Sequence, residues 1–299
     1  MDNYHVPVLL EQSIGGLSIN PNGIYVDCTF GGGGHSKAIL NKLDKGKLIA
    51  FDQDTDAIAN KPKSKNLILV QGNFRFMRNY LRYNNINKVD GILADLGVSS
   101  HHFDTEERGF SFRFSAGLDM RMNQSAELTA QKVLNEYKTE ELKSIFKNYG
   151  ELKNAGRIAG FIDKYRKQQK IETIDQFKEL LEPILPPHAQ SKILAKVFQA
   201  LRIEVNQEME SLKEMLLQTE KVLKQGGRLV VITYHSLEDR LAKNYIKNGM
   251  FEGMPEKDLY GNVDVPFKQV NRKVIVPDNA EIERNSRARS AKLRIAERL

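Results

Sequence analysis

Short apolar runs alternate with helical patterns over the first third of the chain. The runs at 24–26, 47–51, 67–70 and 89–94 predict four buried strands. A helical pattern follows the first of them, from about Ser36 onward. This alternation is typical of an open α/β sheet whose parallel strands are joined by right-handed crossovers. In such a sheet, ligands bind at the carboxyl ends of the strands.

The pattern changes to purely helical between about 128 and 192. Apolar residues there recur at spacings of three and four, and Pro183, Pro186 and Pro187 end the last helix of the segment. One or two long helices over 193–223, a strand at 228–233 and an alternating closing strand near 291–295 then resume the α/β pattern. The sequence therefore predicts a discontinuous α/β domain, residues 1–124 with 193–299, and an inserted all-helical domain, residues 125–192.

The first strand ends at Asp27, and four glycines, Gly31 to Gly34, precede the helical pattern. Glycine lets the backbone turn sharply and approach a ligand without a Cβ in the way. The P-loop pattern is absent, and G-x-G-x-x-G is broken by Ser36, which disfavours nucleotide and nicotinamide enzymes. An acidic residue before such a turn suits a ligand with a cationic amino-acid end, such as S-adenosylmethionine. A purely structural turn is the alternative.

Further polar and aromatic candidates follow the other predicted strands. Asp52 lies 19 residues after Gly33, the position from which an acidic side chain accepts hydrogen bonds from ribose hydroxyls; Asp54 is the competing residue. Phe74 follows the third strand and would either cover an adenine ring or join the core. Asp95 ends the fourth strand, where the reactive end of the ligand is expected.

Three other segments allow both a functional and a structural interpretation. The irregular stretch 101–124 carries three phenylalanines, Phe110, Phe112 and Phe114, which would stack on nucleic acid or anchor the loop to the core. His101 and His102 with Asp104 would form a metal site only if adjacent histidines shared an ion. In the segment 234–240, Ser236 and Asp239 would cap a helix or contact a target.

Composition narrows the class of protein. The chain has 299 residues, 40% hydrophobic and 28% charged, as in soluble globular proteins, and it shows no zinc-binding spacing. No apolar run is long enough to span a membrane, the polar N-terminus is no signal peptide, and the single Cys28 fits a reducing compartment. These features predict a cytoplasmic protein without a metal. The net charge of +7 favours a polyanionic partner such as RNA.

Several blocks resemble the bacterial 16S ribosomal RNA cytosine-N4 methyltransferases, the MraW family. The blocks are His5–Glu11, Asp27–Ser36, Asp95–Ser100, Glu107–Phe112, Leu118–Met122, Phe198–Arg202, Tyr234–Arg240 and Ser286–Ser290. The resemblance implies a class I (Rossmann-like) methyltransferase sheet with an inserted helical domain. The basic face of that domain, with Arg157, Lys164, Arg166 and Lys167, is either a solvated surface or a surface that recognises RNA. The resemblance also implies S-adenosylmethionine as the cofactor. The implied substrate is a cytidine of 16S rRNA at the P site of the decoding centre of the small subunit.

Carried over by motif, the resemblance assigns the cofactor contacts to Gly33, Gly34, His35, Asp52, Phe74, Asp95 and His102. The family often has glutamine where this chain has His102. Asp95 is the expected catalytic proton acceptor, although Asp95-Leu96-Gly97-Val98 lacks the prolines and the aromatic residue usual at this strand end in amino-group methyltransferases. Ser99, His102 or a backbone carbonyl would share that role. A non-catalytic RNA-binding assembly factor with the same fold is the alternative, and a homodimer is left open.

Overall fold

The computed structural model describes residues 7–256, 260 and 263–299, which form two compact units. The α/β unit contains the described residues up to Gly97 and from Met209, and the helical unit spans Val98–Glu208. Segments 98–124 and 193–208 thus belong to the helical unit, whereas the sequence pattern assigned them to the α/β domain. The reason is packing, because Phe110, Leu118 and Met120 are buried in the core of the helical unit.

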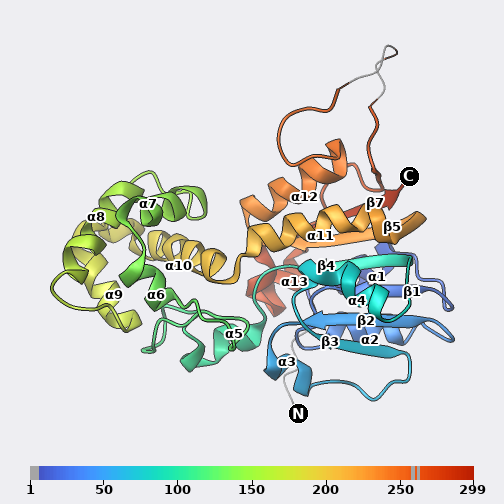
Figure 1. Ribbon diagram of the computed structural model, residues 1–299, viewed down its shortest axis with the longest axis horizontal. Coiled ribbons are helices and arrows are strands. Elements are labelled where there is room, and N and C mark those ends of the chain that lie inside the picture. The colour runs from blue at the N-terminus through green and yellow to red at the C-terminus, as the bar shows by residue number, and fades with distance from the viewer. Residues whose placement is uncertain (1–6, 257–259, 261–262) are drawn as a thin grey trace. The chain divides into compact units, whose positions relative to one another are not determined.

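The described residues of the α/β unit form a seven-stranded sheet in the order β3-β2-β1-β4-β5-β7-β6 (Figure 1). The first five strands in this order, β3, β2, β1, β4 and β5, are parallel to one another, and β7 is antiparallel to both β5 and β6. The strands are β1 (Ile24–Asp27), β2 (Lys47–Asp52), β3 (Leu67–Gln71), β4 (Val89–Asp95), β5 (Leu223–Thr233), β6 (Phe267–Gln269) and β7 (Lys292–Arg298). The α/β class and all six predicted strands are confirmed.

Two details of the sheet differ from the sequence pattern. Gly226 and Gly227 lie inside β5, where the register against β4 shifts, and not before the strand. The three residues of β6 carried no recognisable pattern. The side chains of Lys292 and Arg294 on β7 both form ion pairs with Asp239.

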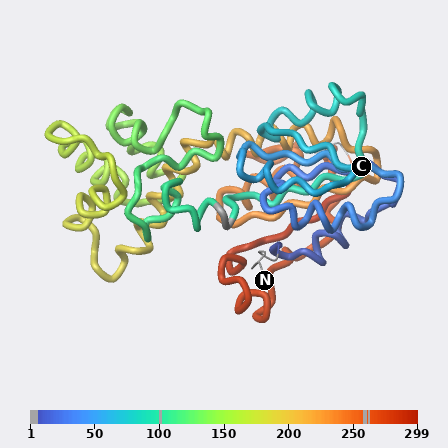
Figure 2. The backbone as a smooth tube through the Cα atoms, turned by 90° about the horizontal axis from the view of Figure 1, so that it is seen from below, coloured from blue at the N-terminus to red at the C-terminus, as the bar shows by residue number. Residues whose placement is uncertain are grey.

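Helices cover both faces of the sheet, as alternate residues of each strand require. Tyr25 of β1 packs on one face against α1 (Leu10–Leu17) and α2 (Gly34–Leu40). Val26 packs on the other face with residues of α4 (Met77–Tyr83), α11 (Glu208–Val222) and α12 (Ser236–Asn248). Figure 2 shows these two layers on opposite sides of the strands. Two short helices, α3 (Thr55–Ala59) and α13 (Asn279–Arg284), complete the unit.

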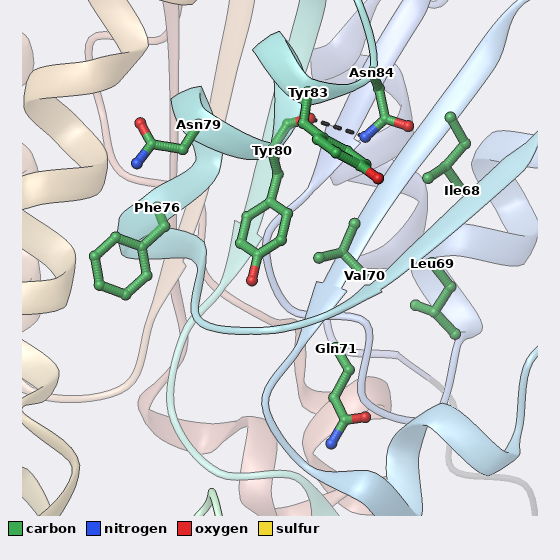
Figure 3. Close-up of a pocket in the computed structure, with 9 residues that line it drawn as sticks. All are labelled: Ile68, Leu69, Val70, Gln71, Phe76, Asn79, Tyr80, Tyr83 and Asn84. Atoms are coloured by element: carbon green, nitrogen blue, oxygen red, sulfur yellow. Dashed lines mark hydrogen bonds between the residues drawn. The ribbon is translucent and has the colours of Figure 1, made fainter.

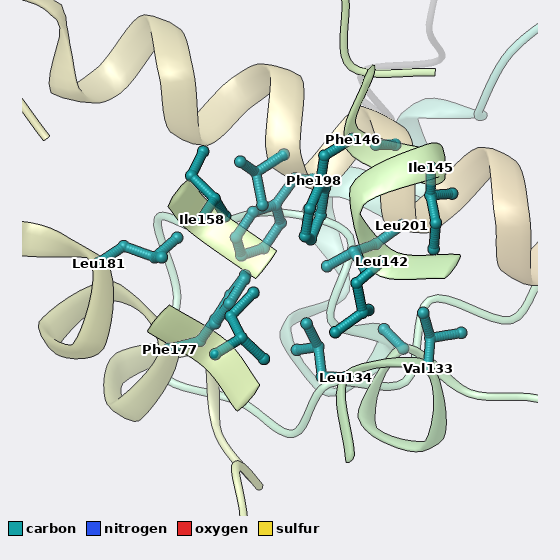
Figure 4. Packing of buried hydrophobic residues seen from close by; sticks show 14 of the residues in the cluster. Val133, Leu134, Leu142, Ile145, Phe146, Ile158, Phe177, Leu181, Phe198 and Leu201 are labelled. Atoms are coloured by element: carbon teal, nitrogen blue, oxygen red, sulfur yellow. The ribbon is translucent and has the colours of Figure 1, made fainter. Parts of the chain in front are cut away.

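The helical unit has its own hydrophobic core (Figure 4). Its helices are α5 (Ser100–Asp104), α6 (Ala130–Glu136), α7 (Thr139–Asn148), α8 (Ala155–Arg166), α9 (Ile174–Leu181) and α10 (Gln190–Asn206). In α9 the apolar stripe predicted from the sequence is buried, and Thr173 caps the helix by accepting a hydrogen bond from the Gln176 N–H. Each fully buried large side chain in this core contributes about 1.5–3 kcal/mol.

The stretch expected to be an irregular loop is anchored to the helical core. Phe110 is buried, and the Phe112 ring packs edge-on against Phe198 at 5.5 Å. The buried Arg108 guanidinium donates hydrogen bonds to the carbonyls of Arg121 and Met122. For Phe110 and Phe112 the structure therefore supports the structural interpretation. Among the described residues, no helix has the length and apolarity needed to cross a lipid bilayer.

Candidate active site

Three buried or half-buried carboxylates end adjacent parallel strands of the α/β unit. Asp27, Asp52 and Asp95 are the last residues of β1, β2 and β4. In the sheet, β1 lies between β2 and β4, so the three carboxylates share one edge. This is the edge at which α/β sheets bind ligands, as the sequence predicted.

Asp27 is fully buried and organises the turn that follows β1. Its carboxylate accepts hydrogen bonds from the Ser36 hydroxyl at 2.6 Å and from the Thr29 N–H at 3.0 Å. Burial raises the pKa of Asp27 to about 6, although the Ser36 hydrogen bond opposes the shift. Asp27 thus links the beginning of α2 to the end of β1, and burying its charged form costs desolvation free energy.

The glycine turn has the backbone conformation that its sequence predicted. Gly31 and Gly33 have φ angles of +51° and +76°, which side chains other than that of glycine rarely allow. A Cβ at Gly31 or Gly32 would meet no atom within 4 Å, so this part of the turn borders open space. A Cβ at Gly34 would lie 2.2 Å from Pro7, which excludes any larger residue without rearrangement.

Asp52 is fixed in an orientation toward the glycine turn. One carboxylate oxygen accepts the Gly31 N–H at 2.7 Å, and the other accepts the Asp54 N–H at 2.9 Å. The competing Asp54 is buried and caps α3 by accepting the Asp56 N–H. Asp54 therefore has a structural task, and Asp52 is the carboxylate at the turn.

Asp95 lies between two aromatic side chains that contact opposite oxygens. Tyr234 donates its hydroxyl to Oδ1 at 2.8 Å, and His35 Nδ1 lies 3.5 Å from Oδ2. Its backbone N–H also donates to Thr29 Oγ1 at 2.7 Å. Burial raises the pKa of Asp95 to about 7, while the Tyr234 hydrogen bond lowers it. A carboxyl group with such a pKa can both accept and release a proton near neutral pH.

His35 is buried in the first turn of α2, and burial lowers its pKa. Its Nε2 lies 3.2 Å from the Val8 carbonyl, which can only accept, so Nε2 carries a proton. In the neutral ring, Nδ1 is then an acceptor directed at Asp95.

Phe74 and His102 are the two remaining predicted contacts. Phe74 follows β3, where it is half-buried against the core. His102 belongs to the helical unit, where Nδ1 contacts the Ser99 hydroxyl at 3.0 Å and the ring lies 4.8 Å from that of Phe110. The alternative metal site would combine His102 with Asp104 and His101, and the side chain of His101 lies outside the described residues.

Comparisons with known proteins show to which family the chain belongs. The model of the MraW methylase family matches residues 2–299. This chain belongs to that family. It is 59% identical over 296 residues to ribosomal RNA small subunit methyltransferase H of Bacteroides thetaiotaomicron, covering 99% of this chain and 97% of that protein. The protein of the same name from Christiangramia forsetii is 58% identical over 297 residues, covering 99% and 98%. A solved rRNA methylase from Streptococcus thermophilus has a TM-score of 0.44 at 14% identity, covering 99% of each chain.

For this MraW-family protein, the sequence pattern missed the contact between Tyr234 and Asp95. The available signal was position, because Tyr234 directly follows β5 and so reaches the same edge as Asp95. The prediction that Ser236 and Asp239 cap the following helix was wrong. His235 is the N-cap of α12 and forms a capping box with Glu238, whereas Asp239 forms ion pairs with Lys292 and Arg294.

Proposed function

We propose that this protein transfers a methyl group from S-adenosylmethionine to the exocyclic N4 amine of a cytidine in small-subunit ribosomal RNA. The proposed target is the cytidine at the P site of the decoding centre in 16S rRNA. Full-length family membership and the names of the relatives support rRNA methylation. The observation that carries the proposal is the strand-end arrangement of Asp52, the glycine turn and the Tyr234–Asp95–His35 group.

The residues at this edge fit the proposed cofactor. The open space beside Gly31 and Gly32 leaves bare backbone for a ligand, and the acidic surroundings suit its ammonium and sulfonium charges. We assign the ribose hydroxyls to Asp52 and contacts of the bound cofactor to Gly33, Gly34, His35 and Asp95. We also assign Phe74, which would cover the adenine, and His102 to the cofactor contacts. The cofactor supplies an electrophilic methyl group on its sulfonium.

Asp95 is the proposed catalytic residue because the amine of cytosine is a poor nucleophile. Its lone pair is delocalised into the ring, so holding the amine in line with the methyl group supplies much of the rate. A carboxylate that accepts an amine N–H localises the lone pair during attack and can receive the proton afterwards. Tyr234 holds Asp95 in one orientation through its hydrogen bond, which also lowers the affinity of the carboxylate for that proton, and His35 Nδ1 lies 3.5 Å from the other oxygen.

The helical unit is proposed to recognise the RNA. Lys153, Arg157, Lys164, Lys167 and Lys170 are exposed on it. Arg166, which the sequence placed with this basic face, instead donates to the carbonyls of Leu134 and Tyr137 and stabilises the unit. We therefore expect the exposed lysines and Arg157, and not Arg166, to contact the RNA phosphates.

The test is transfer of a labelled methyl group from S-adenosylmethionine to small subunits that lack the modification. Digestion to nucleosides then distinguishes N4-methylcytidine from C5-methylcytidine. We expect N4-methylcytidine with the wild-type protein and a loss of at least about 100-fold in rate for Asp95→Ala, since positioned proton acceptors contribute about 10²–10⁴-fold. Asp44→Asn, a change at an exposed carboxylate of the same unit, serves as the matched control.

Two results would contradict the proposal. If Asp95→Ala bound the cofactor and methylated at the wild-type rate, Asp95 would not be the acceptor. If the wild-type protein bound small-subunit RNA but transferred no methyl group, the chain would act as a non-catalytic assembly factor.

A further inference from the structure

A groove outside the candidate active site runs along the edge of the sheet. It lies between β3, the first strand in the sheet order, and the segment 76–83, with a volume of about 670 Å³ (Figure 3). We call it the β3–α4 groove and define it by six of its lining residues: Ile68, Val70, Gln71, Phe76, Asn79 and Tyr83. None of these residues belongs to the glycine turn or to the group around Asp95.

Two aromatic side chains at this groove are exposed to an unusual degree. Tyr83 is 85% exposed and Phe76 is 49% exposed, so neither contributes much to the core. Figure 3 shows the Tyr83 ring beside Val70 and Ile68 of β3, with Phe76 and Asn79 projecting from the other side of the same segment. Flat rings presented in this way give a face on which a nucleobase can stack.

The sequence around the groove is strongly basic. From position 61 to 89 the chain contains no aspartate or glutamate, and all its charged residues are cations: Lys61, Lys63, Lys65, Arg75, Arg78, Arg82 and Lys88. Lys61, Lys63 and Lys65 are exposed and directly precede β3. A local excess of this size over one strand and one helix makes a positive field on this side of the unit.

Helical spacing places the cations beside the aromatic side chain. Arg78 and Arg82 are four residues apart on α4, and Asn79 and Tyr83 form the adjacent row. Arg75 is neutralised by Glu214 of α11, whereas in the described part of the chain no ion pair involves Arg78 or Arg82, which are both exposed. Their guanidinium groups can thus meet phosphates while the neighbouring ring meets a base.

We propose that the β3–α4 groove is a second RNA-binding surface that holds an unpaired segment of the RNA substrate, with a base stacked on Tyr83 and phosphates on Arg78 and Arg82. Only the identity of that RNA as ribosomal rests on the proposed function. Unpaired RNA is favoured over a duplex because a duplex does not offer its base faces for stacking. It is favoured over a peptide strand added to β3 because of the charge.

The experiment measures binding of a short, unstructured, fluorescein-labelled oligoribonucleotide of mixed sequence by anisotropy at several salt concentrations. We expect Tyr83→Ala to raise the Kd about 5- to 100-fold, the range for loss of one base-stacking contact. Arg78→Gln with Arg82→Gln should raise the Kd and lower the slope of log K against log salt by about 1.4, for two phosphate contacts on a single strand.

Matched controls use the same changes elsewhere in the α/β unit. Tyr260→Ala removes another exposed tyrosine, and Lys243→Gln with Lys247→Gln removes two exposed cations spaced four apart on α12. These variants should keep the wild-type Kd and salt slope. Thermal unfolding of every variant shows that the fold is retained, since all the altered side chains are exposed.

Methyl transfer to small subunits, measured in parallel, separates this proposal from the proposed function. A wild-type Kd and salt slope for the groove variants would overturn the groove proposal, even with methylation intact, and would favour a peptide at the β3 edge. Weakened RNA binding by the groove variants, with no methylation by any protein, would support the groove and refute the proposed function.

Discussion

Replacing Tyr234 by phenylalanine tests whether the charge state of Asp95 controls the reaction. The change removes the hydroxyl that donates to Asp95 Oδ1 at 2.8 Å and keeps the aromatic ring. A hydrogen bond to a charged group contributes about 1.5–3 kcal/mol. At 1.36 kcal/mol per pKa unit, its loss raises the pKa of Asp95 by about 1–2 units.

The sign of the shift fixes the expected pH dependence. The hydroxyl stabilises the ionised carboxylate, so without it more alkaline conditions are needed to generate the proton acceptor. With a wild-type pKa of about 7, Asp95 is half ionised at pH 7. In the variant about 1–10% is ionised, so the rate at pH 7 should fall about 5- to 50-fold and recover toward about pH 9.

The assay is single-turnover methyl transfer at saturating cofactor and small subunits across this pH range. Tyr25→Phe is the matched control, because it also removes a buried tyrosine hydroxyl from the α/β unit. That hydroxyl accepts a hydrogen bond from the N–H of Asn20, a residue that precedes β1. The reasoning would be refuted if the acidic limb of the variant's pH–rate profile stayed at the wild-type pH, whatever its maximum rate. The limb would then report a group other than Asp95.

Three further predictions concern stability and cofactor binding. Because burial raises the pKa of Asp27 from 3.8 to about 6, this carboxyl should lower wild-type stability by up to about 3 kcal/mol as pH rises through that range. Asp27→Asn should remove this contribution in urea unfolding and leave the one from Asp95, whose pKa is raised to about 7. Gly34→Ala should cost about 1–3 kcal/mol because its Cβ would overlap Pro7, whereas Gly32→Ala should unfold like wild type and still raise the calorimetric Kd for S-adenosylmethionine. An unchanged Kd for Gly32→Ala would place the cofactor elsewhere. Phe146→Ala should cost about 3–5 kcal/mol in denaturant unfolding, and a loss below about 1 kcal/mol would contradict its burial in the helical core.

Much of the candidate site could be predicted because it depends on local sequence and on one topological rule. Apolar runs identified β1, β2 and β4, and parallel strands joined by crossovers bring their carboxyl ends to one edge. Asp27, Asp52 and Asp95 therefore had to lie near one another once the strands were recognised. The φ angles of Gly31 and Gly33 follow from the same reasoning, since only glycine readily adopts them.

Contacts between distant segments were not predictable in this way. Tyr234 meets Asp95 across 139 residues, and no periodicity in either segment encodes that pairing. The sequence could not tell which of Asp52 and Asp54 contacts the glycine turn, because both follow β2. In the structure Asp54 caps α3, and the Gly31 N–H donates to Asp52.

The extent of the helical unit was also decided by packing. Phe110, Met120 and Phe198 lie outside the segment that the helical pattern marked, yet they are buried in the same core as the inserted helices. By itself, the sequence determined which segments form helices and strands and which chemical groups end the strands, because period, turn chemistry and burial are local properties. Only the tertiary structure decided which groups pair and where one core ends, because those outcomes depend on side chains that meet after the chain has folded.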